Sequence, residues 1–342
     1  MPSNGALVAC QSGFEGLLAR EMMELGVPAI ENGPGWALTA WEADGKGERL
    51  RDSAFAHAII ESPETITGKG VNELAQGLLD YFSGSIKGER IDGVWPCMFA
   101  GGQEIVGLGR RVASVEAAFG ELLKKKLSRI AKLASLERPR IGAARGLFAW
   151  FTDFGTIRVS RSAFLCGQWR MADDDLAPSR SYLKVEEAYG IVGSEPEPGE
   201  TVCDLGAAPG GWSYSAAKRG ARVTAVDNGP LKGGALGNPL VDHRKDDAFG
   251  FSPGKDATYD WLFCDMLEDP HRILRLVAAP WLAGGWCRRF IINFKFGRVD
   301  PVALLGDLRA ADSPFSRHAS GVRISHLYHD REEFTVTGTT SA

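Results

Sequence analysis

Short apolar runs alternate with helical stretches along the second half of the chain. The runs are TVCDL (201–205), RVTAV (222–226), DWLFCD (260–265) and FIINFKF (290–296). Apolar strands separated by helices are typical of an open parallel sheet with helices on both faces. The end of the chain differs, because RISHLYHDREEFTVTG (323–338) holds two strand-like runs with no helix between them. We therefore expect a Rossmann-like α/β domain over residues 169–342, closed by an antiparallel hairpin.

The first half of the chain mixes strands and helices in a different order. Residues 1–50 predict a small α/β unit, with strands at 6–10 and 35–43 and a helix at 13–26. Residues 51–168 alternate strand-like pieces with amphipathic helices, which is typical of an α+β domain. The polar, acidic stretch WRMADDDLAPSR (169–180) predicts an exposed connector to the third unit.

Length and composition fit an ordinary globular protein. At 342 residues the chain suggests two or three domains, and it is 44% hydrophobic and 24% charged. The first residues show no signal-peptide pattern, and no run of 18 uncharged apolar residues occurs, so we expect a cytoplasmic protein without membrane contact. The six cysteines are scattered without a CxxC pair, which favours reduced thiols over a metal site.

One segment departs from the net charge of -4. Between Arg110 and Arg145 the chain holds ten basic residues and three acidic ones. Such a segment is typical of a face that binds a polyanion. The same stretch also has apolar residues at helical spacing over 117–133, so it equally predicts an amphipathic helix with a solvated face. The two interpretations are compatible.

A glycine turn follows the first strand of the C-terminal unit. In GAAPGG (206–211) the second glycine comes four residues after the first, so the spacing is not the GxGxxG of dinucleotide sites. Asp204 ends the first strand. Asp227 ends the second, where its carboxylate is placed to accept hydrogen bonds from two ribose hydroxyls. Asp247 ends a weaker third strand and is placed to bind an adenine amine. These features indicate S-adenosylmethionine, which has a ribose and an adenine but no phosphate.

The residues at the later strand ends indicate which group is methylated. Asp265 follows the fourth strand without the Asp/Asn-Pro-Pro-aromatic turn typical of amino-group methylation, and Cys264 should face the core rather than act as a nucleophile. Lys184, Lys295 and Glu333 complete a Lys-Asp-Lys-Glu set at one edge of the sheet. This set suits methylation of a ribose 2'-hydroxyl. We expect Lys295 to be the base, with its pKa lowered by Lys184 and by partial burial.

Several motifs resemble one known family. They are APSRSYLKVEEAY, DLGAAPGGWSY, VDNGP, CDM, GWCRRFIINFK and LYHDREEFTV, between residues 177 and 336. They resemble the RlmM family of bacterial 23S ribosomal RNA 2'-O-ribose methyltransferases, in the FtsJ-like superfamily, whose substrate is a cytidine conventionally numbered 2498. The resemblance implies a ferredoxin-like unit at 1–50, a THUMP RNA-binding domain at 51–168 and the methyltransferase domain at 169–342. It also implies immature or unfolded 23S ribosomal RNA as the partner.

The resemblance also assigns roles to residues of this chain. It implies that S-adenosylmethionine is contacted by Ser181, the turn Ala208-Pro209-Gly210-Gly211, Asp227, Asp247 and Asp265, with Lys295 as proton acceptor. Ser181 comes from the resemblance alone, whereas Asp204 and Gly206 come from the turn. Ala208 stands where the family often has cysteine, and the connector before residue 177 is shorter than expected. Glu332 competes with Glu333 as the fourth member, and the resemblance favours Glu333.

Other functions stay open at this point. The same catalytic set would serve on transfer RNA or another RNA, because every RNA carries the 2'-hydroxyl. A non-catalytic RNA-binding or ribosome assembly factor is a further alternative, and a NAD-dependent oxidoreductase is disfavoured by the turn. Trp212, Phe294 and Phe296 predict core positions, with stacking on the target base as the alternative. His326 and His329 show no metal-ligand spacing and predict polar surface or RNA contacts. We expect a monomer.

Overall fold

The computed structural model describes residues 5–40, 46–137, 140–254 and 257–341. It divides into two compact units, Met1–Gly167 and Gln168–Ala342. The predicted strand at 35–43 lies partly outside the described residues. Arg138 of the basic segment also lies outside them. Among the described helices, none combines the length and the hydropathy of a membrane span.

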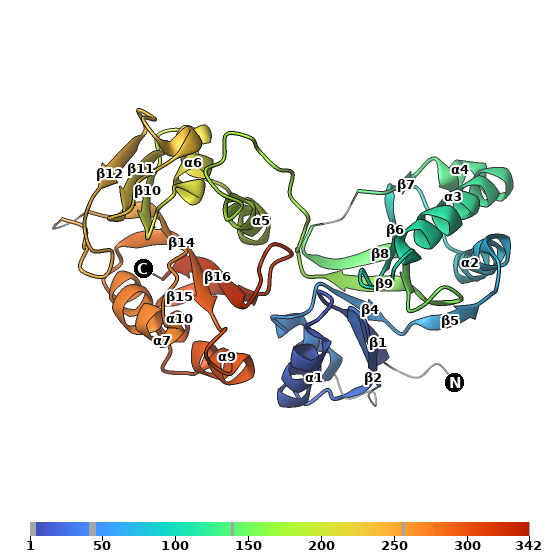
Figure 1. The fold of residues 1–342 in the computed structure, drawn as a ribbon. Coiled ribbons are helices and arrows are strands. Elements are labelled where there is room, and N and C mark those ends of the chain that lie inside the picture. The colour runs from blue at the N-terminus through green and yellow to red at the C-terminus, as the bar shows by residue number, and fades with distance from the viewer. Residues whose placement is uncertain (1–4, 41–45, 138–139, 255–256, 342) are drawn as a thin grey trace. The chain divides into compact units, whose positions relative to one another are not determined.

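The first unit is built on one sheet in the order β2-β3-β1-β4-β9-β8-β6-β7, with β5 paired to β9 (Figure 1). Its strands are β1 (Gly5–Ala9), β2 (Ala29–Gly33), β3 (Trp36–Ala40), β4 (Ala58–Glu61), β5 (Glu64–Thr67), β6 (Trp95–Gly101), β7 (Ala134–Ser135), β8 (Gly142–Phe151) and β9 (Thr156–Leu165). Because β1 pairs with β4, the sheet runs without a break across residue 50. The division of this unit into a ferredoxin-like part and a THUMP part therefore stays a prediction.

The helices of the first unit are α1 (Glu15–Glu24), η1 (Lys46–Asp52), α2 (Val71–Ser85), α3 (Leu108–Lys126) and α4 (Ser128–Ala131). The three longer ones, α1, α2 and α3, each bury one face. On α3, Val115, Phe119 and Leu123 recur at helical spacing and are buried. They pack with α2 and with apolar residues of β6, β8 and β9 in one core. The part of the basic segment on α3 is thus a packed amphipathic helix with its other face in solvent, whereas Arg145 lies on β8.

The second unit is a seven-stranded sheet in the order β12-β11-β10-β13-β14-β16-β15. Its strands are β10 (Thr201–Leu205), β11 (Arg222–Val226), β12 (Val241–Arg244), β13 (Tyr259–Cys264), β14 (Cys287–Lys295), β15 (Ala319–Ser325) and β16 (Glu333–Thr340). The strands from β12 to β14 are parallel, whereas β16 runs antiparallel to both β14 and β15. The predicted Rossmann-like sheet and its closing hairpin are confirmed.

Helices lie on both faces of the second sheet (Figure 1). They are α5 (Tyr182–Val192), α6 (Gly211–Lys218), η2 (Gly233–Ala235), α7 (Pro270–Ile273), η3 (Leu274–Ala278), α8 (Ala279–Ala283), α9 (Pro301–Arg309) and α10 (Pro314–His318). Trp212 of α6 packs edge-on against Phe263 of β13, while Phe315 of α10 packs against Phe290 and Phe294 of β14. The strand register puts Phe263 opposite Ile291, so Asn293 and Lys295 share the face of the sheet on which α5 and α6 lie.

Candidate active site

The four predicted catalytic residues meet at the carboxyl edge of the parallel strands. Asp265 follows the last residue of β13, Lys295 is the last residue of β14, and Glu333 is the first residue of β16. The antiparallel register sets Lys295 directly opposite Glu333. Lys184 reaches them from α5, which covers the same face.

These side chains form a closed ring of alternating charge. Lys295 Nζ contacts both Asp265 Oδ1 and Glu333 Oε2. Lys184 Nζ lies 2.6 Å from Glu333 Oε1 and 3.5 Å from Asp265 Oδ2. The ring holds two ammonium groups and two carboxylates, so its net charge is zero. All four side chains are at most 20% exposed, so water screens their interactions only weakly.

The direction of the Lys295 pKa differs from the sequence-based expectation. Burial alone lowers the pKa of Lys295, but the charges of Asp265 and Glu333 outweigh burial and raise it above the ordinary lysine value. The expected lowering is therefore wrong, because Lys184 is neutralised by the same two carboxylates that hold Lys295. Burial raises the pKa of Glu333, but Lys295 and Lys184 outweigh burial and lower it.

The glycine turn after β10 is closely packed, with no room for a Cβ atom at Gly206 or Gly210. Gly206 has φ +74° and Gly210 has φ +105°, a region that favours glycine. A Cβ atom on Gly206 would lie 2.2 Å from Met266 Cγ, and one on Gly210 would lie 2.6 Å from Ala235 Cβ. A Cβ atom on Gly211 would lie 3.1 Å from Ser181 Oγ, so Ser181 borders the same turn.

Asp227 lies at the edge of this turn, as predicted from its position after β11. Its Oδ2 accepts a hydrogen bond of 2.9 Å from the Ala208 N–H, and its Oδ1 accepts one of 2.6 Å from the Gly229 N–H. The carboxylate is half-buried and held from two sides, and its remaining lone pairs suit the two hydroxyls of a ribose. A fixed carboxylate beside a glycine turn without the dinucleotide spacing fits the ribose of S-adenosylmethionine.

Two other predicted cofactor ligands lie elsewhere than the sequence suggested. Strand β10 continues through Leu205, and Asp204 is buried with its carboxylate accepting a hydrogen bond of 2.6 Å from Ser213 Oγ. Strand β12 ends at Arg244, so Asp247 lies three residues beyond it rather than at its end. Asp247 is exposed and accepts a hydrogen bond of 3.1 Å from the Phe249 N–H.

The comparison with known proteins identifies the family. The sequence model of a protein family described as FtsJ-like methyltransferase matches residues 177–274. Proteins named Ribosomal RNA large subunit methyltransferase M from Azoarcus sp. (strain BH72) and Marinomonas sp. (strain MWYL1) are 33% and 31% identical to this chain. The alignments cover 97% and 96% of this chain and 95% and 97% of the relatives. The chain belongs to this family.

Membership of the ribosomal RNA large subunit methyltransferase M family confirms the predicted enzyme class and methyl donor. The protein is an S-adenosylmethionine-dependent methyltransferase. The FtsJ-like match includes the glycine turn, Asp227 and Asp265 but ends before Lys295 and Glu333. The structure links these two residues to the matched region, because Lys295 lies opposite Glu333 and contacts both Glu333 and Asp265.

Several polar residues of this methyltransferase site were missed or misplaced by sequence reasoning. Glu187 of α5 is buried and accepts hydrogen bonds from the N–H groups of Trp169, Tyr328 and His329. It thus ties the connector and the β15–β16 loop to α5. His326 is fully buried, so the expected surface position is wrong, and burial lowers its pKa to about 4. Asn293 was also missed, although a polar residue inside FIINFKF was a visible exception to an apolar strand.

Three aromatic residues and the cysteines belong to the core. Trp212, Phe294 and Phe296 are at most 4% exposed, which favours the predicted core role over stacking on a base. All six cysteines are buried free thiols. Within the described parts of the chain, no group of His, Cys, Asp and Glu side chains suits a metal ion.

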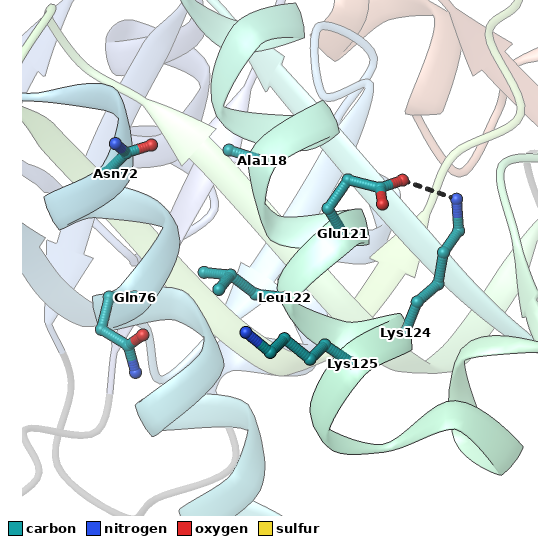
Figure 2. A pocket seen from close by; sticks show the side chains of 7 residues that line it. All are labelled: Asn72, Gln76, Ala118, Glu121, Leu122, Lys124 and Lys125. Atoms are coloured by element: carbon teal, nitrogen blue, oxygen red, sulfur yellow. Dashed lines mark hydrogen bonds and ion pairs between the residues drawn. The ribbon is translucent and has the colours of Figure 1, made fainter.

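A shallow hollow of about 650 Å³ lies between α2 and α3 in the first unit. Figure 2 shows its lining: Asn72 and Gln76 from α2, and Ala118, Glu121, Leu122, Lys124 and Lys125 from α3. Lys124 Nζ lies 2.8 Å from Glu121 Oε1, whereas Lys125 extends toward α2 in the figure. Other basic residues of the segment are also paired, since Arg129 contacts Asp92 and Arg145 contacts Glu89.

The buried Asp204 predicts a measurable effect of pH on stability. Burial and the nearby charges of Asp265 and Asp227 raise the pKa of Asp204 to about 7. In the native protein Asp204 therefore keeps a proton that the unfolded chain releases at ordinary carboxyl pH. Its contribution to stability falls as the pH rises from about 4 to about 7. Asp204→Asn keeps a neutral acceptor for Ser213 and removes this loss.

We expect the stability of Asp204→Asn, relative to the unchanged protein, to increase from pH 4 to pH 7 and then to level off. Urea unfolding at several pH values measures this difference. Asp242→Asn, at an exposed carboxylate on β12, is the matched control and should give no such slope. A stability difference that is the same at pH 4 and pH 7 would show that Asp204 is not held protonated.

Proposed function

We propose that this methyltransferase transfers the methyl group of S-adenosylmethionine to the 2'-hydroxyl of a cytidine in 23S ribosomal RNA. The observation that carries the proposal is the ring of Lys295, Asp265, Lys184 and Glu333 at the strand ends. The names of the family's members support ribosomal RNA as the substrate. The cytidine and the 2'-oxygen rest on the resemblance and on the chemistry of the ring.

In the proposed reaction, the 2'-oxygen attacks the methyl carbon and its proton passes to Lys295 Nζ. When bound, the cofactor supplies the electrophilic methyl group and leaves as the neutral thioether. Asp227, Ser181 and the turn from Gly206 to Gly211 would hold the cofactor. Lys295 accepts the proton only as the neutral amine, so the ammonium form that its raised pKa favours must first lose a proton. In this proposal Lys184 Nζ, which contacts the same two carboxylates, weakens their hold on the Lys295 proton.

Asp204 has a positioning role in this proposal. Its buried carboxylate bonds to Ser213 of α6 and so fixes the start of this helix behind the glycine turn. Asp247 stays a proposed adenine ligand, supported by its exposed carboxylate in the loop after β12. We further propose a cytoplasmic monomer, in keeping with a ribosomal RNA substrate and free buried thiols.

The experiment is methyl transfer from labelled S-adenosylmethionine to unmodified 23S RNA, with 16S RNA and transfer RNA as parallel substrates. The methylated position is mapped by resistance to alkaline cleavage, because a 2'-O-methyl group blocks cleavage at that nucleotide. Label at one alkali-resistant cytidine of 23S RNA is the expected result. Label only on transfer RNA would overturn 23S RNA as the substrate. Label on a base would overturn methylation of the 2'-hydroxyl.

The solvent-facing lysines of the basic segment are proposed to bind RNA phosphates. Lys125, Lys126 and Lys132 are exposed and form no ion pair with a described residue. Replacing all three with glutamine should remove up to three phosphate contacts. We expect the slope of log affinity against log salt to shrink by about 2 and the affinity at 0.1 M salt to fall about 100-fold. Filter binding with 23S RNA fragments over a salt series measures both values.

The matched control is Lys87→Gln, which removes an exposed lysine of the same unit outside the basic segment. Its affinity and salt slope should match those of the unchanged protein. Equal salt slopes for the triple variant and the control would show that these lysines do not contact RNA.

A further inference from the structure

Asn293 is an uncharged residue of β14 whose side chain contacts two members of the catalytic ring. It is fully buried, and its Nδ2 lies 3.0 Å from Asp265 Oδ1 and 3.4 Å from Glu333 Oε2. Both of those carboxylates are acceptors only, so the NH₂ end of the amide must face them. Asn293 thereby donates to the same oxygen atoms that Lys295 contacts.

The opposite end of the amide is fixed from β16. Thr335 lies directly across from Asn293 in the register, and its Oγ1 is 2.7 Å from Asn293 Oδ1. The same hydroxyl lies 3.1 Å from Asp330 Oδ2. Burial and the charge of Glu333 raise the pKa of Asp330, which favours its protonated form. Because a protonated Asp330 can donate to the Thr335 oxygen, the single hydroxyl proton of Thr335 can serve Asn293 Oδ1.

We infer that Asn293 is a positioning residue of the methyl-transfer site, whose amide holds Asp265 and Glu333 in the orientation in which both contact Lys295. The inference rests on the proposed role of Lys295 as base. The two N–H bonds also draw negative charge away from the carboxylate oxygens, so they limit how strongly those oxygens hold the proton on Lys295. Asn293 therefore acts on the reaction through Lys295 and does not touch the substrate.

The test is Asn293→Asp, which keeps the shape of the side chain, removes the two N–H donors and adds a negative charge. The titratable groups around this position are Lys184 from α5, Asp265 after β13, Lys295 from β14, and His326, Asp330 and Glu333 from the β15–β16 hairpin. A third carboxylate among them should raise the pKa of Lys295 by about one unit. The neutral fraction of Lys295 should fall about tenfold.

Trace acetylation followed by mass spectrometry reads this neutral fraction without any RNA, with the exposed Lys218 as internal reference. We expect Lys295 labelling to fall about tenfold in Asn293→Asp. A variant that merely loosened the site would expose Lys295 and raise its labelling. The pH at which methyl transfer reaches half its maximum should rise by about one unit. Unchanged or faster labelling in Asn293→Asp would overturn the inference.

Two further variants keep the test decisive if Asn293→Asp folds poorly. Thr335→Val removes the hydroxyl that fixes the amide and should slow Lys295 labelling, whereas Thr335→Ser should restore it. Ile292→Val, on the opposite face of β14, is the matched control for a weakened strand and should leave labelling unchanged. The variants could show slower Lys295 labelling while the unchanged protein fails to methylate RNA. That combination would overturn the proposed function and leave the positioning role in place. Equal labelling in the two Thr335 variants would overturn the positioning role alone.

Discussion

Methyl transfer is expected to fall about 1,000-fold when Lys295 is replaced by methionine, because the variant loses the proposed acceptor of the 2'-hydroxyl proton. Methionine keeps much of the length and volume of the lysine side chain, so the packing at the end of β14 is largely preserved. Cofactor affinity should change little, since Asp227 and the glycine turn are not altered. Single-turnover transfer to 23S RNA and equilibrium dialysis with S-adenosylmethionine measure the two quantities.

Lys218→Met is the matched control for loss of a lysine in the same unit. Lys218 lies on α6 and pairs with Asp174, away from the ring. This control should transfer methyl groups at the rate of the unchanged protein. A Lys295→Met variant that keeps more than a tenth of the original rate would show that another group accepts the proton. Loss of cofactor binding in the variant would instead point to a misfolded site.

The strand pattern was sufficient to predict which edge of the sheet brings the candidate catalytic residues together. Parallel strands place their carboxyl ends on one side of a sheet, so Asp227, Asp265 and Lys295 follow from their positions after apolar runs. The antiparallel hairpin adds Glu333, and strand alternation separates it from the exposed Glu332. Lys184 was predicted from its position in the helix before the first strand and from the need for a second ammonium group, and the structure brings it into the ring.

What the sequence did not predict depends on distances between groups far apart in the chain. The pKa of Lys295 is raised because the carboxylates of Asp265 and Glu333 both contact its ammonium group. Sequence spacing does not predict these two contacts. The burial of Asp204 depends on which side of β10 it faces and on where that strand ends. Asn293 and Thr335 are 42 residues apart, yet they share one hydrogen bond that only the β14–β16 register explains.

Glu333→Gln is expected to have the largest effect on stability. Glu333 is 5% exposed and contacts both lysines, so its loss leaves two ammonium groups sharing one carboxylate in a poorly solvated ring. Removing one partner of a buried ion pair costs about 3 kcal/mol of unfolding free energy. Glutamine has the same shape, so the effect reflects charge rather than volume. Glu332→Gln, at the exposed neighbouring residue, is the matched control and should leave stability unchanged.

The pH dependence of stability tests whether Glu333 acts through its charge. The lowered pKa of Glu333 means that its stabilisation is complete above the ordinary carboxyl range and is lost as the pH falls through its native pKa. The stability difference between Glu333→Gln and the unchanged protein should therefore be constant from pH 7 to about pH 5 and shrink below it. The same variant should also lower the pKa of Lys295 and shift methyl transfer to lower pH, opposite to Asn293→Asp. A stability difference that persists unchanged at pH 3.5 would mean that Glu333 stabilises the site by packing and not by its charge.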